Sequence, residues 1–302
     1  MDEQPASHPR LGQFPPAIVI PPLSSTHNLT IVFLHGRGSN ARKFHGPLLE
    51  SAISNASTAP KLREALPHVR FVFPTAPLAR AAKYRRCAIH QWYEGTGDWE
   101  PQSRGEMRPG VELVRAVLRE EVVRLGGDTR RLVLAGISQG CAMALTSLLL
   151  WEGDPLGAVV VMCGFVPLAE SLLAIFEEEG RSEGDSDDQG VVFEPDDPFE
   201  RCDSDDVRTP LQQAIDELRD EAEVPAACPT TAQPFPFLST PVFMGHGTED
   251  EKVQYQHGQQ AAKLLEMMGI SVDFRTYPGL GHWYSPDMLG HIVEFLHGKL
   301  DS

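Results

Sequence analysis

A serine between two glycines is the first residue of this chain whose type and setting indicate chemistry. It lies in Gly136-Ile137-Ser138-Gln139-Gly140, after the apolar run RLVLAG and before the run CAMALTSLLL. A serine on a sharp turn from a strand into a helix stands above the sheet edge, where the helix N-terminus favours a developing oxyanion. Glycines two residues to either side let strand and helix approach each other. The pattern predicts that Ser138 is a nucleophile; the alternative is an ordinary glycine-rich loop.

A serine hydroxyl needs a general base and a carboxylate that orients the base. In folds that carry this turn, the acid and then the histidine follow the serine along the chain, each after a later strand. Asp250, between Glu249 and Glu251, follows the apolar run TPVFMGHG, and His282 lies in a glycine-rich segment after SVDFRTY. Order and placement predict Ser138, Asp250 and His282 as a catalytic triad. The alternative for the two partners is an exposed loop acid and a surface histidine.

The elements that must position these residues alternate between strands and helices. Apolar runs predict strands within 17–22, 29–36, 69–77, 131–136, 157–165, 240–247 and 271–279. Helices are predicted over 111–125, 141–150, 256–268 and 285–300. Strands that are apolar on both faces and alternate with helices are typical of a parallel sheet covered on both sides. We therefore expect a single α/β domain over residues 1–302.

The negative charge of the chain is concentrated in one segment. The 302 residues carry a formal net charge of −16, and residues 177–223 hold 19 acidic residues against 4 arginines. The rest is close to neutral, so charge gives no support for binding nucleic acid. Such a segment buries too little apolar surface to offset its ordering entropy. We expect 177–230 to be an acidic, largely disordered insertion with a short helix from Thr209 to Glu221; the functional alternative is a mobile lid or interaction segment.

Cysteine usage and hydropathy bear on the compartment. The five cysteines are odd in number and lack CxxC spacing, which favours a reducing environment over a disulfide framework or a cysteine-rich zinc site. No apolar run reaches the length of a membrane span, and the first ten residues contain no apolar leader. We expect a cytoplasmic protein without a transmembrane segment, and no metal or organic cofactor, since the histidines lack metal-ligand spacing such as HExxH. The cysteines are Cys87, Cys141, Cys163, Cys202 and Cys228.

Four motifs in this order resemble those of the phospholipase/carboxylesterase family of α/β-hydrolases, which includes the acyl-protein thioesterases. They are FLHGRGS, GISQG, HGTEDEKV and GLGH, and the resemblance covers about residues 28–170 and 238–300. It implies an α/β-hydrolase fold with a mostly parallel sheet covered by helices on both faces. It also implies that the backbone N–H groups of Arg37 and Gln139 form the oxyanion hole. The segment HQWYEG resembles the family segment that lines the acyl site, which points to Trp92 and Tyr93; the alternative is ordinary core or loop aromatics.

The resemblance implies a serine hydrolase that cleaves carboxylic esters or thioesters through an acyl-enzyme, with a lipidated protein as one candidate substrate. The alternatives are a small-molecule carboxylesterase or lysophospholipase, a peptidase of the same fold, and a non-catalytic binding protein. The oligomeric state is left open. Departures from the family pattern indicate a divergent branch but remove no catalytic group; they are Ser39, Asn40, Cys141 and Glu251.

A basic cluster lies between the third and fourth predicted strands, at Arg80, Lys83, Arg85 and Arg86. Its simplest interpretation is a solvated loop. The alternatives are contact with an anionic substrate or with the acidic insertion.

Overall fold

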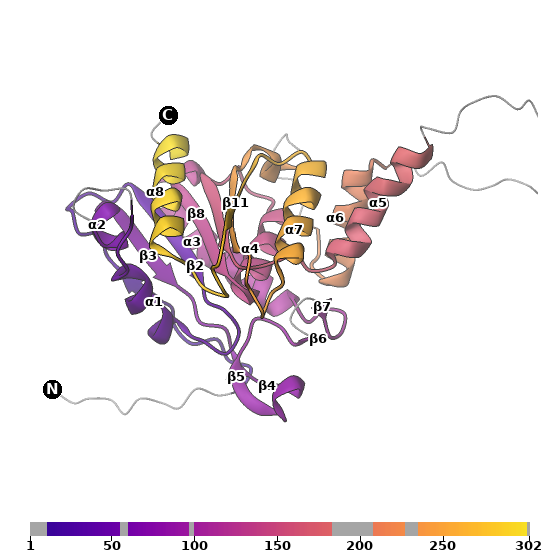
Figure 1. Ribbon diagram of the computed structural model, residues 1–302, viewed down its shortest axis with the longest axis horizontal. Helices are drawn as coiled ribbons and strands as arrows, with labels where there is room; N and C mark the ends of the chain where they lie inside the picture. Colours follow the sequence, from indigo (N-terminus) through magenta and orange to yellow (C-terminus); the bar gives the residue numbers. More distant parts are fainter. Residues whose placement is uncertain (1–10, 55–59, 97–99, 183–207, 227–234, 301–302) are drawn as a thin grey trace, which may run out of the picture.

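A seven-stranded sheet forms the centre of the protein (Figure 1). The computed structural model describes residues 11–54, 60–96, 100–182, 208–226 and 235–300. The strands are β1 Ile18–Ile20, β2 Leu29–Leu34, β3 Val69–Phe73, β8 Leu132–Ile137, β9 Ala158–Met162, β10 Val242–Gly247 and β11 Val272–Tyr277. Their order in the sheet is β1-β3-β2-β8-β9-β10-β11. Within this sheet only β1 runs antiparallel to its neighbour, so the sheet is mostly parallel. Each of the seven predicted apolar runs corresponds to one of its strands.

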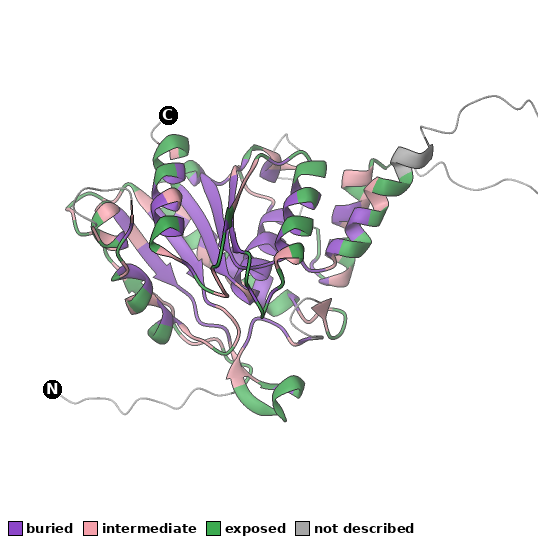
Figure 2. Ribbon diagram, in the orientation of Figure 1, coloured by how far each residue is buried: buried purple, intermediate pink, exposed green. Residues whose placement is uncertain are grey.

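Helices cover both faces of the sheet, and each face has its own core. One core lies under α1 Ala41–Leu49, α2 Leu62–Ala65 and α8 Pro286–Leu300. The other lies under α3 Arg108–Arg124, α4 Gln139–Leu149 and α7 Tyr255–Met267. Successive side chains of a strand point to opposite faces, so in β8 Leu132 and Leu134 join one core and Val133 joins the other. Figure 2 shows the buried residues along the strands and the inward faces of the helices. The predicted covered sheet is confirmed.

Two short hairpins lie outside the main sheet. In the first, β4 Leu78–Ala81 pairs with β5 Cys87–His90 across the 3-10 turn Ala82–Tyr84. In the second, β6 Gly95–Thr96 pairs with β7 Glu100–Pro101. Figure 1 shows the β4–β5 hairpin projecting from the body of the molecule. The basic cluster predicted to be a loop is therefore carried on this hairpin.

Part of the acidic insertion is an ordered helix that joins the core. The helix α5 spans Ala169–Ser182, and α6 spans Pro210–Glu221 with Thr209 as its N-cap. The two helices pack together beside α7 (Figure 1). Helical spacing gathers apolar side chains on one face of α6 although its composition is acidic. The buried ones are Ala214, Ile215 and Leu218. The predicted short helix is confirmed; 183–207 and 227–230 lie outside the described residues.

The described cysteines are free thiols. Cys141 and Cys163 are buried and Cys87 is exposed. Burial raises the pKa of the Cys163 thiol to about 12, so this side chain is uncharged at neutral pH. Cys202 and Cys228 fall outside the described ranges.

Across those ranges, none of the helices has both the length and the apolar character that a membrane crossing requires.

Candidate active site

Ser138 lies on a sharp turn between β8 and α4, as the glycine spacing predicts. It is the N-cap of α4 and has φ 57° and ψ −124°, a conformation that costs a residue with a side chain about 1–3 kcal/mol. The flanking glycines make the turn possible. A Cβ on Gly136 would lie 2.2 Å from the carbonyl oxygen of Gly140, and one on Gly140 would lie 2.3 Å from that of Leu34. Because strand and helix are packed on both sides, the turn is held in this strained form.

We expect Gly140→Ala to destabilise the fold by about 3 kcal/mol and to distort the turn. The added Cβ would meet the backbone carbonyls of Leu34 and His35 at 2.3 and 2.7 Å, and backbone has less room to move than a flexible side chain. Urea unfolding measures the loss. The matched control is Gly298→Ala in α8, where a Cβ meets nothing within 4 Å and the helix should gain about 0.5–1 kcal/mol. Equal midpoints for the two variants would show that the steric account is wrong.

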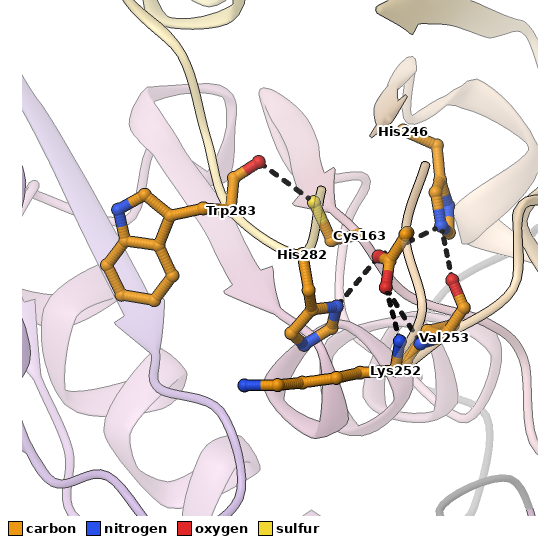
Figure 3. Close-up of polar contacts among 7 residues, drawn as sticks. Cys163, His246, Lys252, Val253, His282 and Trp283 are labelled. Carbon is orange, nitrogen blue, oxygen red and sulfur yellow. Dashed lines mark hydrogen bonds and ion pairs between the residues drawn. The ribbon is translucent and has the colours of Figure 1, made fainter. Parts of the chain in front are cut away.

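Asp250 follows β10 and His282 follows β11, and their side chains are in contact. Figure 3 shows the residues that contact this carboxylate, which are His246, Lys252, Val253 and His282. His282 Nδ1 donates to Asp250 Oδ2 at 2.7 Å, because an ionised carboxylate only accepts. The other oxygen, Oδ1, accepts from the backbone N–H groups of Lys252 and Val253, each at 2.9 Å. Burial by itself would raise the pKa of Asp250, but hydrogen bonds from His246, His282 and the Val253 N–H outweigh it and hold the pKa well below its usual range. The carboxylate is therefore charged. Because it accepts a hydrogen bond from Nδ1 of His282, the other ring nitrogen, Nε2, faces away from Asp250.

A second histidine, His246, contacts the same carboxylate. Its Nε2 lies 3.3 Å from Asp250 Oδ2 and 2.9 Å from the carbonyl oxygen of Val253. Both oxygens accept, so Nε2 carries a proton. His246 is not among the site residues predicted from the sequence; the available signal was its place at the end of the strand that precedes Asp250.

Ser138 and His282 line one cleft of about 400 Å³. Its lining also includes Gly36, Tyr84 of the hairpin and Trp283, which is 49% exposed. No hydrogen bond joins the Ser138 hydroxyl to His282 among the described residues; such bonds are often long before substrate binds. The structure thus brings the predicted serine and histidine to one cleft, with Asp250 behind the histidine.

The two predicted oxyanion donors flank Ser138. Gln139 is the first residue of α4, so its backbone N–H has no partner within the helix. Arg37 lines the same cleft, in a loop that presses against the turn: a Cβ on Gly36 would lie 3.2 Å from Ser138 Cβ. The next residue, Gly38, has φ 78° and anchors the loop through its N–H. Their role in binding an oxyanion stays a prediction.

Trp92 and Tyr93 lie beneath the site and do not form the cleft wall. Each is 2% exposed, and neither lines the cleft. Trp92 Nε1 donates to the carbonyl oxygen of His35 at 2.7 Å. The Gln139 side chain accepts from the Trp92 N–H at 3.0 Å and donates to the Tyr93 carbonyl at 2.8 Å. Both residues are buried, and the printed bonds of the Trp92 ring and of the two backbones support the loop and the helix start. A role in lining the acyl site stays a prediction.

His35, which is also close to the cleft, is a neutral structural residue. Its Nδ1 donates to the Gly36 carbonyl at 2.8 Å, and its Nε2 accepts from the Ala76 N–H at 3.0 Å. Burial lowers the pKa of His35 to about 4, so the ring is uncharged at neutral pH. In the part of the chain that the structure describes, no group of three or more His, Cys, Asp or Glu side chains is placed to hold a metal ion.

A mostly parallel sheet covered on both faces, with a serine turn between strand and helix, defines an α/β-hydrolase fold. The sequence model of the phospholipase/carboxylesterase family matches residues 16–178, and the chain belongs to this family of serine esterases and thioesterases. A model of the prolyl oligopeptidase family also matches, over residues 111–301. The predicted family and fold are confirmed.

Individual relatives match most of the chain. The chain is 21% identical over 294 residues to acyl-protein thioesterase 1 of Debaryomyces hansenii, covering 96% of this chain and 99% of the relative. It is 23% identical to carboxylesterase SOBER1 of Arabidopsis thaliana, covering 89% and 90%. The crystal structure of SOBER1 superposes with a TM-score of 0.60 at 22% identity, over 90% of this chain and 99% of that one. These likenesses bear on family and fold; the substrate is a separate question.

Proposed function

We propose that this protein is a serine hydrolase that cleaves carboxylic esters or thioesters. Ser138 is the nucleophile, His282 the general base and Asp250 the acid that orients His282. One observation carries the proposal: the strained serine and a histidine bonded to a buried carboxylate share a cleft. Membership of an esterase family supports the ester bond as the target.

The reaction follows from the positions of the protons. Nδ1 of His282 is bonded to Asp250, so Nε2 takes the proton of Ser138 as its Oγ attacks the carbonyl carbon. The N–H groups of Arg37 and Gln139 bind the oxyanion, each contributing about 3–4 kcal/mol. Protonated His282, stabilised by the Asp250 charge, then protonates the leaving alcohol or thiol. Water, activated by His282, releases the acid from the acyl-enzyme.

The names of the relatives give two candidate substrate classes, an acylated protein and a small carboxylic ester. The prolyl oligopeptidase match adds a peptide bond as a third. The cleft favours the small ester, because a volume of about 400 Å³ leaves little room for a long acyl chain.

We therefore expect hydrolysis of p-nitrophenyl esters to fall from butyrate to palmitate, by about tenfold or more in kcat/KM. A palmitoyl-thioester peptide and a prolyl peptide amide, assayed alongside, test the other two classes. A fluorophosphonate probe tests the non-catalytic alternative, because it labels only an activated serine. Faster turnover of palmitate would reassign the substrate to long acyl chains. Absence of labelling and of all hydrolysis would contradict the proposed function.

A further inference from the structure

Among the described residues that line the cleft at Ser138, cationic side chains outnumber acidic ones, although the protein as a whole is strongly acidic. Its described lining includes three cationic side chains, Arg37, Lys83 and Lys252, and a single acidic one, Glu251. The chain has a formal net charge of −16. The balance at the cleft is therefore opposite in sign to that of the molecule.

Lys252 places one of these charges in the cleft that Ser138 and His282 also line. Its backbone N–H donates to Asp250 Oδ1 at 2.9 Å, which fixes the start of its side chain beside the acid. In the view of Figure 3 the Lys252 side chain extends past the His282 ring. A substrate anion paired with this ammonium would lie in the same cleft as the carbonyl that Ser138 attacks.

The hairpin holds the other two cations at the wall of the cleft. The Tyr84 ring lies 5.6 Å from the guanidinium carbon of Arg37 and 5.9 Å from Lys83 Nζ, and all three residues line the cleft. Cation–π attraction keeps both charges at the ring. Arg37 Nε also donates to Gln91 Oε1 at 3.0 Å, which orients the guanidinium. One member of the basic cluster thus belongs to the cleft.

We propose that this cleft selects esters or thioesters that carry a carboxylate or phosphate near the scissile carbonyl. The inference rests on the proposed hydrolase function and adds the charge of the substrate to it. Cationic groups in a partly enclosed cleft raise the local concentration of an anionic substrate and orient it. Loss of one cation should therefore affect an anionic ester more than a neutral one of the same length.

The test compares mono-p-nitrophenyl glutarate, which ends in a carboxylate, with p-nitrophenyl pentanoate, which is neutral. We expect the anionic ester to have the higher kcat/KM at low salt, by about tenfold, and this ratio to shrink as salt screens the charges. Lys252→Met keeps the length of the side chain and the backbone N–H, and should lower the ratio about fivefold. Lys83→Met should also lower the ratio. Lys299→Met, at the exposed end of α8, is the control and should leave the ratio unchanged.

The outcomes separate this proposal from the function on which it rests. Hydrolysis of both esters with a ratio at or below one overturns the proposal and leaves ester hydrolysis standing. A ratio that neither Lys252→Met nor Lys83→Met alters also overturns it, even where both rates fall together, since that pattern indicates a purely structural role. Hydrolysis of neither ester contradicts the proposed function itself.

Discussion

Replacing Ser138 by alanine is expected to lower kcat for ester hydrolysis by about 10⁴–10⁶-fold and to abolish labelling by a fluorophosphonate. The variant lacks the oxygen that forms the acyl-enzyme, so His282 and the oxyanion donors have no nucleophile to assist. The residual rate reflects water attack on a bound substrate. Alanine at φ 57° is strained much as serine is, so the fold should keep its stability.

The measurement is steady-state hydrolysis of a short p-nitrophenyl ester, with mass spectrometry of the probe adduct. Ser39→Ala is the matched control, because Ser39 lines the same cleft but has no predicted role as a nucleophile. It should retain the adduct on the peptide that contains residue 138. An adduct on Ser138→Ala, or turnover within tenfold of the unsubstituted protein, would assign the chemistry to another residue.

The second large effect is expected from Asp250→Asn, which should lower kcat by about 10³–10⁴-fold. Oδ1 of Asp250 accepts two backbone N–H groups, so the amide oxygen of an asparagine would have to face Lys252 and Val253. Its NH₂ would then face His282 Nδ1 and His246, where both partners now donate. His282 would have to move its proton to Nε2, and in that tautomer it cannot accept the proton of Ser138.

The same kinetic assay checks this expectation, with Glu249→Gln as the control. Glu249 precedes the acid, is exposed and does not line the cleft, so its neutralisation should change kcat by less than about twofold. If the two variants lost equal activity, general charge and not the bond to His282 would explain the effect. Circular dichroism shows whether each variant is folded.

The pH dependence of stability gives a second readout of Asp250. Its pKa is lowered in the folded protein, so its ionisation stabilises the fold above the unfolded value of about 3.9. That contribution is lost as the pH falls toward the folded value. Asp250→Asn should therefore show a shallower loss of stability below about pH 4 than the unsubstituted protein, in urea unfolding at a series of pH values.

Local patterns predicted the strands and the turn well and the accessory elements poorly. The seven strands are short apolar runs that end at turn residues, and such runs have few other stable arrangements. The β4–β5 hairpin has no comparable signal, because its two strands have only four residues each and are mostly exposed or partly buried. The helix α6 shows the reverse case: composition favours disorder, but the spacing of Ile215 and Leu218 builds a buried face.

The candidate triad could be predicted from the chain alone, because its signals lie in neighbouring residues and in the order of the strands. The glycines at 136 and 140 create the turn of Ser138, and the order of later strands selects Asp250 and His282. Which side chains meet depends on packing between distant segments. Motif likeness pointed to Trp92 and Tyr93 but not to the direction of their rings, which burial turned inward.

The remaining features of the site also follow from packing. The meeting of three cations around one cleft joins segments that are separated along the chain by tens to hundreds of residues. Spacing within a segment carries no information on such distances. Distances between such segments are set by the packing of helices on the two faces of the sheet, which brings the carboxyl ends of β2, β8, β10 and β11 to one edge.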